Sequence, residues 1–322
     1  MMLELRTDRA RKRNLLRRVR RQRLKYITIL PSLITLLNGV CGFAAIVFAS
    51  KGFSGGVNNF SFHKIELPYF AIAGYMIFFA MIADMLDGRV ARMSHTTSSF
   101  GGQLDSLCDI ISFGVAPVFL MLKVLDYKLT ELVAPTLPVS DFLGRFIWLA
   151  AAIYVACAAI RLARFNVENE EDETAHMSFV GLPVPAAAGV LASLIVFYED
   201  TLPTMGRNSP IFNIGENVIL CSLPFITIGV ALLMISRIRY PHLINLYFKG
   251  RKPFEHLVWL VIVIGLIYWS LQSALLLIFC GFALSGFVKW FYYKVIISKV
   301  SGQTRGAPSG LTIADTADPP DD

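Results

Sequence analysis

Long apolar runs recur along the 322 residues, and they constrain the fold more than any other feature of the sequence. A membrane-spanning helix needs about 20 mainly apolar residues. Hydrophobic residues make up 55% of the chain, so we predict an all-α integral membrane protein with about eight transmembrane helices. The predicted spans cover residues 27–50, 68–92, 99–126, 143–165, 182–200, 214–236, 255–270 and 273–297.

Basic residues indicate on which side of the membrane the chain ends lie. An even number of spans places both termini on one side, and Lys and Arg crowd the cytoplasmic connections of membrane proteins. The loops at 51–67, 127–142 and 201–213 are sparse in basic residues, so both termini are predicted to be cytoplasmic. The basic residues on the termini side are Arg89, Arg92, Arg161, Arg164, Arg237, Arg239, Lys249, Arg251, Lys252, Lys289, Lys294 and Lys299.

The segments around the predicted core differ from it in composition. The first 25 residues hold 11 Lys and Arg against two acids, which favours anchoring on anionic lipid over nucleic-acid binding. An acidic run from Glu168 to Glu173 is predicted to be a solvated loop, with a metal-attracting lip as the alternative. The five cysteines are scattered singly, so neither a disulfide framework nor a zinc site is predicted. The predicted division is a basic arm at 1–26, a six-span core at 27–236, a basic interfacial connection at 237–254, two further spans at 255–299 and a disordered tail at 300–322.

Four aspartates interrupt the apolar sequence between the second and third spans. They are Asp84, Asp87, Asp105 and Asp109. A charge at membrane depth costs about 2.5 kcal/mol or more, so four carboxylates require partners, and a metal ion is the natural candidate. At helical spacing, Asp84 and Asp87 share one face, and Asp105 and Asp109 share another. We therefore expect two helices to offer their carboxylates to one cleft.

The stretch has the pattern D-x-x-D-G-x-x-A-R, then eight residues, then G-x-x-x-D-x-x-x-D. It resembles the signature of the CDP-alcohol phosphotransferases, membrane enzymes that displace CMP from a CDP-activated donor with an alcohol. The resemblance implies that Asp84, Asp87, Asp105 and Asp109 hold two divalent cations, Mg²⁺ or Mn²⁺. It also implies that Asp109 is the catalytic base and that the protein is a homodimer.

The other fixed positions of the pattern suit a nucleotide site. Gly88, Ala91 and Gly101 leave room beside the aspartates, and Arg92 can meet a phosphate through a bidentate fork. The alternatives are ordinary ones, because small residues on membrane helices also serve as packing surfaces and arginines near span ends as anchors.

Further runs resemble the phosphatidylserine synthase branch of this family. They are Leu30-Pro31-Ser32-Leu33-Ile34-Thr35-Leu36-Leu37-Asn38 with Cys41-Gly42, Ser112-Phe113-Gly114-Val115-Ala116-Pro117, Arg161-Leu162-Ala163-Arg164-Phe165-Asn166 and Gly181-Leu182-Pro183-Val184-Pro185-Ala186-Ala187-Ala188. Ser32 stands where that branch usually has Asn. The resemblance implies transfer of the phosphatidyl group from CDP-diacylglycerol to the hydroxyl of L-serine, with release of CMP. It further implies a bacterial inner-membrane protein whose active site faces the cytoplasm.

Two alternatives to this function remain open from the sequence. Another acceptor, such as glycerol 3-phosphate or inositol phosphate, would require more basic residues for its extra phosphate. A cation transporter would carry acids on several spans at mid-depth, whereas here they cluster on two predicted helices. The candidate residues for serine or the lipid phosphate are Arg161, Arg164, Asn166, Ser112 and Thr35.

Overall fold

The computed structural model describes residues 32–53, 59–62, 65–94, 99–132, 138–171, 181–206, 209–236, 238, 265–266 and 270–292. The first helix covers Ser32–Phe53. The elements that follow are β1 (Asn59–Phe62), β2 (Ile65–Pro68), α2 (Tyr69–Ser94), α3 (Ser99–Asp109), the π-helical segment η1 (Ile110–Val115), α4 (Ala116–Leu132), α5 (Pro138–Glu171), α6 (Val184–Val196), the π-helical segment η2 (Phe197–Thr201), the 3₁₀ turn η3 (Leu202–Met205), α7 (Pro210–Ile235) and α10 (Leu271–Tyr292).

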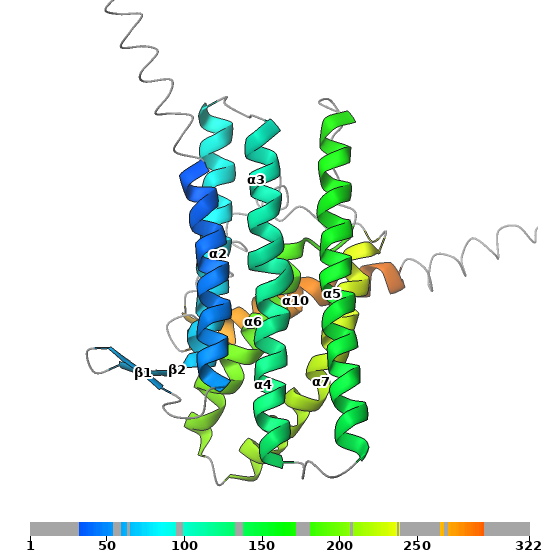
Figure 1. Ribbon diagram of the computed structural model, residues 1–322. Helices are drawn as coiled ribbons and strands as arrows, with labels where there is room; N and C mark the ends of the chain where they lie inside the picture. Colours follow the sequence, from blue (N-terminus) through cyan, green and yellow to red (C-terminus); the bar gives the residue numbers. More distant parts are fainter. Residues whose placement is uncertain are drawn as a thin grey trace, which may run out of the picture.

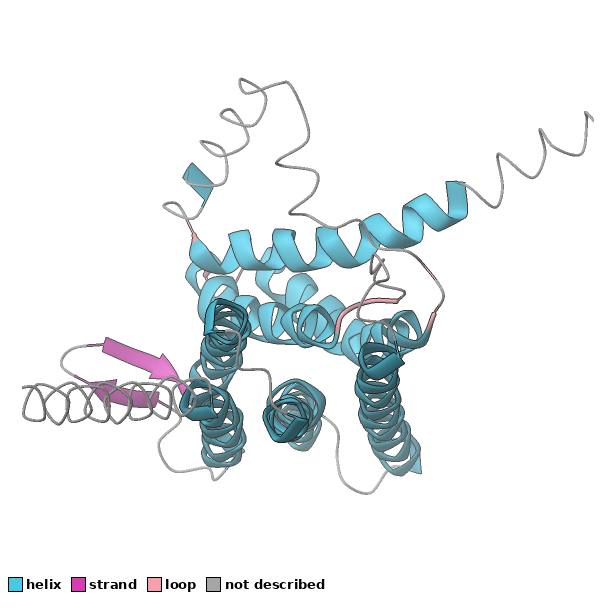
Figure 2. Ribbon diagram, turned by 90° about the horizontal axis from the view of Figure 1, so that it is seen from above, coloured by secondary structure: helices cyan, strands magenta, loops and turns pink. Residues whose placement is uncertain are grey.

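The long helices stand side by side along one axis (Figure 1). The first helix, α2, the continuous α3–η1–α4 and α5 form one side of the bundle, and α6 and α7 lie behind them with a tilt (Figure 1). Seen from above, α10 runs across the long helices rather than along them (Figure 2). Its Phe279 ring packs on Gly189 of α6, where a side chain would collide with it.

Seven described helices are long and apolar enough to cross a membrane. The predicted multi-pass helical architecture is therefore confirmed, with α10 qualifying by length and composition while lying across the others (Figure 2). The span count of eight and the side on which the termini lie stay predictions. The arm at 1–26, the tail at 300–322 and nearly all of the connection at 237–254 and of the span at 255–270 lie outside the described residues.

Two described regions differ from the prediction. One is a β-hairpin in a stretch that is predicted to be a loop, and the other is the end of α5, which enters the predicted acidic loop. β1 and β2 pair antiparallel, with Phe62 opposite Ile65 and Asn59 opposite Pro68, in a stretch that was predicted to be a loop. Alternating apolar residues on both sides of a short connection are the sequence signal for this hairpin. Helix α5 continues to Glu171, so the first part of the predicted acidic loop is helical.

Helix α6 is the centre of the bundle. Eleven of its 13 residues are buried, and it contacts α2, α4, α7 and α10. Pro183 is its N-cap residue, and Pro185 stands in the first turn, where proline is favoured because the backbone N–H groups there have no partner within the helix. Gly181 has φ +89°, and a Cβ there would lie 2.9 Å from the Ser236 carbonyl oxygen. The Gly181 and Leu182 N–H groups donate to the carbonyls of Ile238 and Leu233, so the start of α6 is fixed to the end of α7.

The π-helical segment η1 follows Asp109 directly. The Ala116 N–H donates to the Ile111 carbonyl, the i to i−5 pattern of a π-turn. Neighbouring helices bind the segment as well. The buried Tyr154 hydroxyl of α5 donates to the Phe113 carbonyl at 3.1 Å, and the Ser112 hydroxyl donates to the Asn38 carbonyl of the first helix at 2.9 Å. The turn that carries Asp109 is thereby held from two sides.

Candidate active site

Three carboxylates from two helices meet near one end of the bundle. Asp84 comes from α2, and Asp105 and Asp109 come from α3, where a spacing of four residues stacks them on one face. One carboxylate oxygen from each lies within 4.8 Å of the other two. The sequence pattern predicted that two helices would each offer two carboxylates to one cleft, and the structure brings these three of the four together.

Asp87 lies one turn along α2 from Asp84 and is 6% exposed. The Thr35 side chain of the first helix hydrogen-bonds its carboxylate. Its second oxygen, Oδ2, is buried and has no hydrogen-bond partner among the described residues. The Asp87 carboxylate is therefore hydrogen-bonded to the first helix and keeps one oxygen that can accept a further ligand.

The acids open on a cavity of about 380 Å³ between α2, α3, α5 and the start of α6, which we call the acid cleft. One wall is apolar, and Arg161 of α5 lies in the lining with only 7% of its surface exposed. Arg161 is the single cationic side chain among the described lining residues. These residues are Asp84, Met85, Gly88, Asp105, Asp109, Arg161, Leu162, Phe165, Pro183, Val184 and Pro185.

Comparison with known proteins identifies this arrangement. The sequence profile of the CDP-alcohol phosphatidyltransferase family matches residues 28–235, which contain the whole acid cleft. The chain belongs to the CDP-alcohol phosphatidyltransferase family. It is accordingly a membrane-embedded transferase of phospholipid biosynthesis.

Relatives of this phosphatidyltransferase cover most of the chain. A Helicobacter pylori (strain J99) protein named CDP-diacylglycerol–serine O-phosphatidyltransferase is 30% identical over 265 residues, which are 82% of this chain and 98% of that protein. The Bacillus subtilis protein of the same name is 31% identical over 66% of this chain and 90% of its own length. The one from Methanocaldococcus jannaschii is 32% identical over 70% of this chain and 79% of its own.

The family depends on divalent cations, and the donor set of this phosphatidyltransferase fits them. Ca²⁺, Mg²⁺ and similar hard cations take oxygen ligands, chiefly carboxylates and amide oxygens. Two buried carboxylate oxygens in this region have no hydrogen-bond partner among the described residues: Asp87 Oδ2 and Asp105 Oδ1. A buried oxygen without a partner is costly, so the cleft is arranged for a ligand that supplies positive charge.

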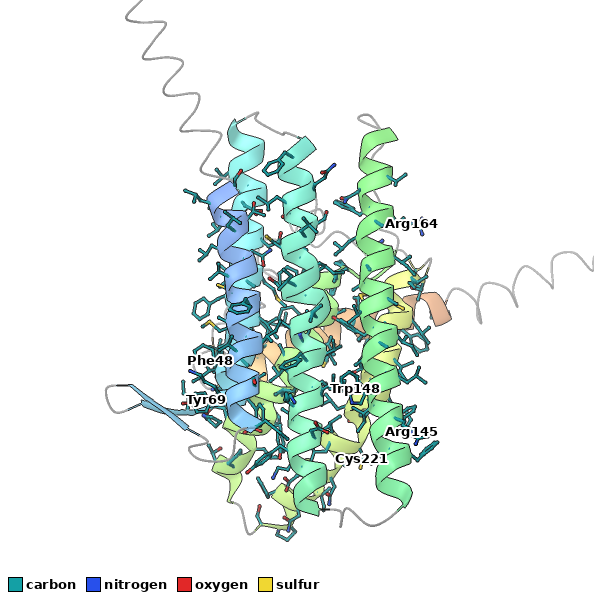
Figure 3. The ribbon with its side chains drawn as sticks, viewed as in Figure 1. Phe48, Tyr69, Arg145, Trp148, Arg164 and Cys221 are labelled. Carbon is teal, nitrogen blue, oxygen red and sulfur yellow. The ribbon has the colours of Figure 1, made fainter. Side chains whose placement is uncertain are left out.

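The two predicted arginines of the phosphatidyltransferase differ in position. Arg161 is buried in the cleft lining, and its Nη2 donates to the Gly181 carbonyl at 3.5 Å. Arg164 is exposed on α5 and points away from the bundle (Figure 3). The structure therefore separates a pair that the sequence placed together as candidates for an anionic substrate group.

The remaining three candidates, Asn166, Thr35 and Ser112, lie outside the described cleft lining. Asn166 of α5 donates to the Ser106 hydroxyl of α3 at 2.8 Å, beside Asp105. Thr35 hydrogen-bonds the Asp87 carboxylate, and the Ser112 hydroxyl donates to the Asn38 carbonyl of the first helix.

The nucleotide candidates of the phosphatidyltransferase are placed unequally. Gly88 lines the cleft, and a Cβ there would have nothing within 4 Å. Gly101 is partly buried outside the lining, and the side chains of Ala91 and Arg92 lie outside the described residues.

Sequence reasoning gave no role to one residue that contacts the site directly. Asn38 of the first helix is fully buried, and its Nδ2 donates to Asp109 Oδ1 at 2.8 Å. Asn38 was recognised only as part of a sequence run that resembles the family. A polar side chain inside a predicted span was the available signal, because such groups are costly unless they bind a partner.

Proposed function

We propose that this phosphatidyltransferase is a phosphatidylserine synthase, which moves the phosphatidyl group from CDP-diacylglycerol to the hydroxyl of L-serine and releases CMP. The observation that carries the proposal is one buried arginine in a cleft that is otherwise acidic and apolar. The names of the relatives from Helicobacter pylori, Bacillus subtilis and Methanocaldococcus jannaschii support the same acceptor.

Asp84, Asp87, Asp105 and Asp109 would hold two divalent cations, Mg²⁺ or Mn²⁺. When bound, the cations neutralise the pyrophosphate and stabilise the leaving oxygen of CMP. Gly88 leaves the space that a nucleotide needs beside Asp84. Ala91, Arg92 and Gly101 are proposed to belong to the same nucleotide site because they fill the fixed positions of the family's sequence pattern.

Asp109 is the proposed base. The serine hydroxyl oxygen forms a new bond to the phosphorus of the phosphatidyl group, while the bond from that phosphorus to the CMP oxygen breaks and CMP leaves with the electron pair. The hydroxyl proton passes to Asp109. A positioned base contributes about 10² to 10⁴ in rate. Asp109 suits this role because it lies on the cleft wall one turn from Asp105.

Arg161 is the proposed partner of the serine carboxylate. Arginine binds carboxylates through two parallel hydrogen bonds, and burial strengthens such contacts. A single guanidinium group in the cleft matches an acceptor alcohol that carries a single anionic group. Glycerol 3-phosphate or inositol phosphate would bring a phosphate group of higher negative charge. The described lining offers no second cationic side chain to bind it.

The test is an assay of the purified protein with CDP-diacylglycerol, Mg²⁺ or Mn²⁺ and a panel of labelled alcohols. We expect lipid product from L-serine and little from glycerol 3-phosphate, inositol phosphate or water. Faster transfer to a phosphorylated alcohol than to serine would overturn the acceptor assignment and leave the family assignment intact.

We also propose that the acid cleft faces the cytoplasm of a bacterial inner membrane and that the protein is a homodimer. The bias of Lys and Arg among the connections supports the orientation. In a Cys221→Ser background, Gln103→Cys at the cleft end should react with an impermeant thiol reagent only after the cells are opened. Thr204→Cys, on the connection between α6 and α7, should react in intact spheroplasts. The opposite pattern would reverse the orientation.

A further inference from the structure

The first helix contacts two of the four aspartates, although it contributes no acid to the cleft. Thr35 hydrogen-bonds Asp87 of α2, and Asn38 donates to Asp109 of α3. Thr35 and Asn38 are three residues apart and therefore lie on one helix face. Both are at least 95% buried, so these bonds form away from water. One face of the first helix thus holds one carboxylate on each of the two acid-bearing helices.

Two glycines explain how Asn38 reaches Asp109. A Cβ on Gly42 would lie 2.6 Å from the Ser112 Cα, and a Cβ on Gly39 would lie 2.9 Å from the Cys108 sulfur. Without side chains at these positions, the first helix approaches the α3–η1 backbone closely, as small residues permit in membrane helices. The Ser112 hydroxyl also bonds the Asn38 carbonyl, so the Asn38 backbone is fixed on the helix that carries Asp109.

The bond from Asn38 defines the orientation of the Asp109 carboxylate. A carboxylate rotates easily about its terminal torsion, and its two oxygens exchange unless one is held. Here Oδ1 accepts the Asn38 amide proton, which leaves Oδ2 for the cleft. Asn38 Oδ1 itself is buried without a partner among the described residues, so the amide is kept in place at a cost.

We propose that Asn38 is a positioning residue that holds Asp109 with one oxygen turned toward the acceptor hydroxyl. The inference rests on the proposed role of Asp109 as base. Asn38 touches neither substrate, and it acts on turnover only through Asp109. Thr35 is the matched comparison, since it holds a different aspartate, Asp87, from the same helix face.

The test is a double-mutant cycle between positions 38 and 109. Asn38→Leu keeps the approximate side-chain size and removes the donor. We expect kcat to fall about 10- to 100-fold, which is typical when a residue that orients a metal-binding side chain by a hydrogen bond is removed. Affinity for CDP, measured by calorimetry with Mg²⁺, and KM for CDP-diacylglycerol should change much less than kcat, because the loss of an interaction that acts only in the transition state lowers kcat without weakening substrate binding.

The cycle separates positioning from a general structural effect. In an Asp109→Asn background, Asn38→Leu should lower kcat no further, whereas Thr35→Val should lower it by the same factor as in the parent. If Asn38→Leu multiplies the defect of Asp109→Asn, or weakens CDP affinity as strongly as turnover, the inference is wrong. Should Asn38→Leu fail to give folded protein in detergent, the cycle is run with Asn38→Ser. This variant keeps a small hydrogen-bond donor, so its kcat should fall less than that of Asn38→Leu.

The single variant Asp109→Asn tells this failure apart from a failure of the proposed function. If it retains turnover, the assignment of Asp109 as base is wrong whatever position 38 does. If it loses turnover and keeps CDP affinity, the base assignment stands and the cycle alone decides on Asn38.

Discussion

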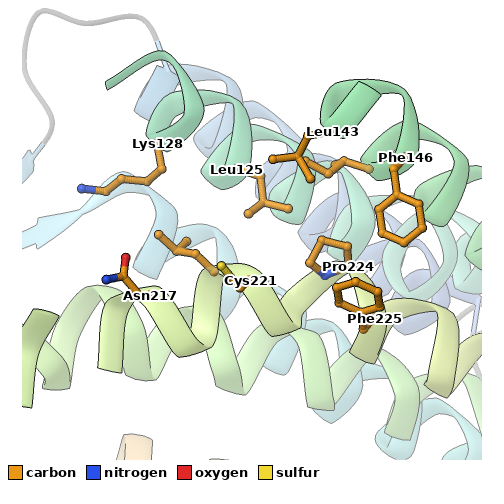
Figure 4. A pocket seen from close by; sticks show the side chains of 10 residues that line it. Leu125, Lys128, Leu143, Phe146, Asn217, Cys221, Pro224 and Phe225 are labelled. Atoms are coloured by element: carbon orange, nitrogen blue, oxygen red, sulfur yellow. The ribbon is translucent and has the colours of Figure 1, made fainter. Parts of the chain in front are cut away.

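Two cavities of similar size lie at opposite ends of this bundle and differ in chemistry. The acid cleft holds about 380 Å³ between α2, α3, α5 and α6. A second cavity of about 300 Å³, the apolar pocket, lies between α4, α5 and α7 (Figure 4). Asp105 and Leu125 lie on the same continuous helix, about 30 Å apart at about 1.5 Å of rise per residue. The residues that line the apolar pocket are Leu125, Lys128, Leu143, Phe146, Ile147, Asn217, Leu220, Cys221, Pro224 and Phe225.

The polar groups of the two regions are satisfied to different degrees. At the apolar pocket, Lys128 pairs with Glu216 at 3.1 Å, and Glu216 also accepts the Tyr198 hydroxyl at 2.9 Å. In the lining of the acid cleft, Asp105 keeps a buried oxygen without a partner among the described residues, and so does the neighbouring Asp87, which lies outside that lining. Volume alone therefore does not distinguish a reactive site. Unpaired buried oxygens mark the cleft as the end that requires a charged ligand.

The strongest way to break this comparison is to remove an acid. We expect Asp84→Ala, Asp87→Ala and Asp105→Ala each to abolish lipid product formation. Substituting a residue that hydrogen-bonds a metal ligand typically lowers activity about 10- to 100-fold. Removing a proposed ligand itself should therefore lower turnover by more than about 100-fold. Chelation should stop the parent enzyme, and added Mg²⁺ or Mn²⁺ should restore it.

The matched control is Asp126→Ala, which removes an exposed acid from the pocket end of the same continuous helix. It should keep product formation within about twofold of the parent, since a surface charge contributes little. Full activity of the parent in excess chelator would contradict the cation role of the cleft.

An intermediate effect is expected at Arg161. A hydrogen bond to a charged group is worth about 1.5–3 kcal/mol, so Arg161→Gln should raise KM for serine about 10- to 100-fold. The KM for CDP-diacylglycerol should change much less. Arg164→Gln, which alters an exposed arginine three residues away, is the control and should leave both constants within about twofold. A larger rise in KM for CDP-diacylglycerol than for serine would assign Arg161 to the lipid phosphate.

The smallest effect on turnover is expected in the apolar pocket. Leu220 is 8% exposed, and Leu220→Ala should lower the free energy of unfolding by about 2 kcal/mol or more, because it enlarges a cavity. Thermal unfolding in detergent measures this loss. At a temperature where the variant is folded, kcat should stay within about twofold. A tenfold loss of turnover in stable protein would make the apolar pocket part of the reaction.

The sequence predicted the acids of the cleft well because their spacing is local. Residues four apart on one helix share a face, so Asp105 and Asp109 could be paired from the sequence. Asp84 was expected beside them because charges at membrane depth need a common partner. Arg161 was predicted together with Arg164, because both suit an anion. Only the packing of α5 against the start of α6 separates the buried arginine from the exposed one.

The contacts that the sequence did not predict join distant parts of the chain. The bond from Asn38 to Asp109 spans 71 positions, and it depends on close helix approach at Gly39 and Gly42. The hairpin was hidden because short strands give weak periodicity beside long apolar runs. The π-helical segment changes no hydrophobic pattern, since both its flanks continue as helix.

The π-helical segment also lets the two ends of the continuous α3–η1–α4 helix take different rotations about the helix axis. A π-turn accommodates one additional residue, and each residue of an α-helix advances by about 100°, so α4 is rotated by about that amount relative to an uninterrupted continuation of α3. The direction in which Asp105 and Asp109 point is thereby uncoupled from the direction in which Leu120, Met121 and Val124 enter the core. The segment has the geometry of a one-residue insertion, so the direction of the reactive side chains at one end of the helix does not fix the direction of the packing side chains at the other end.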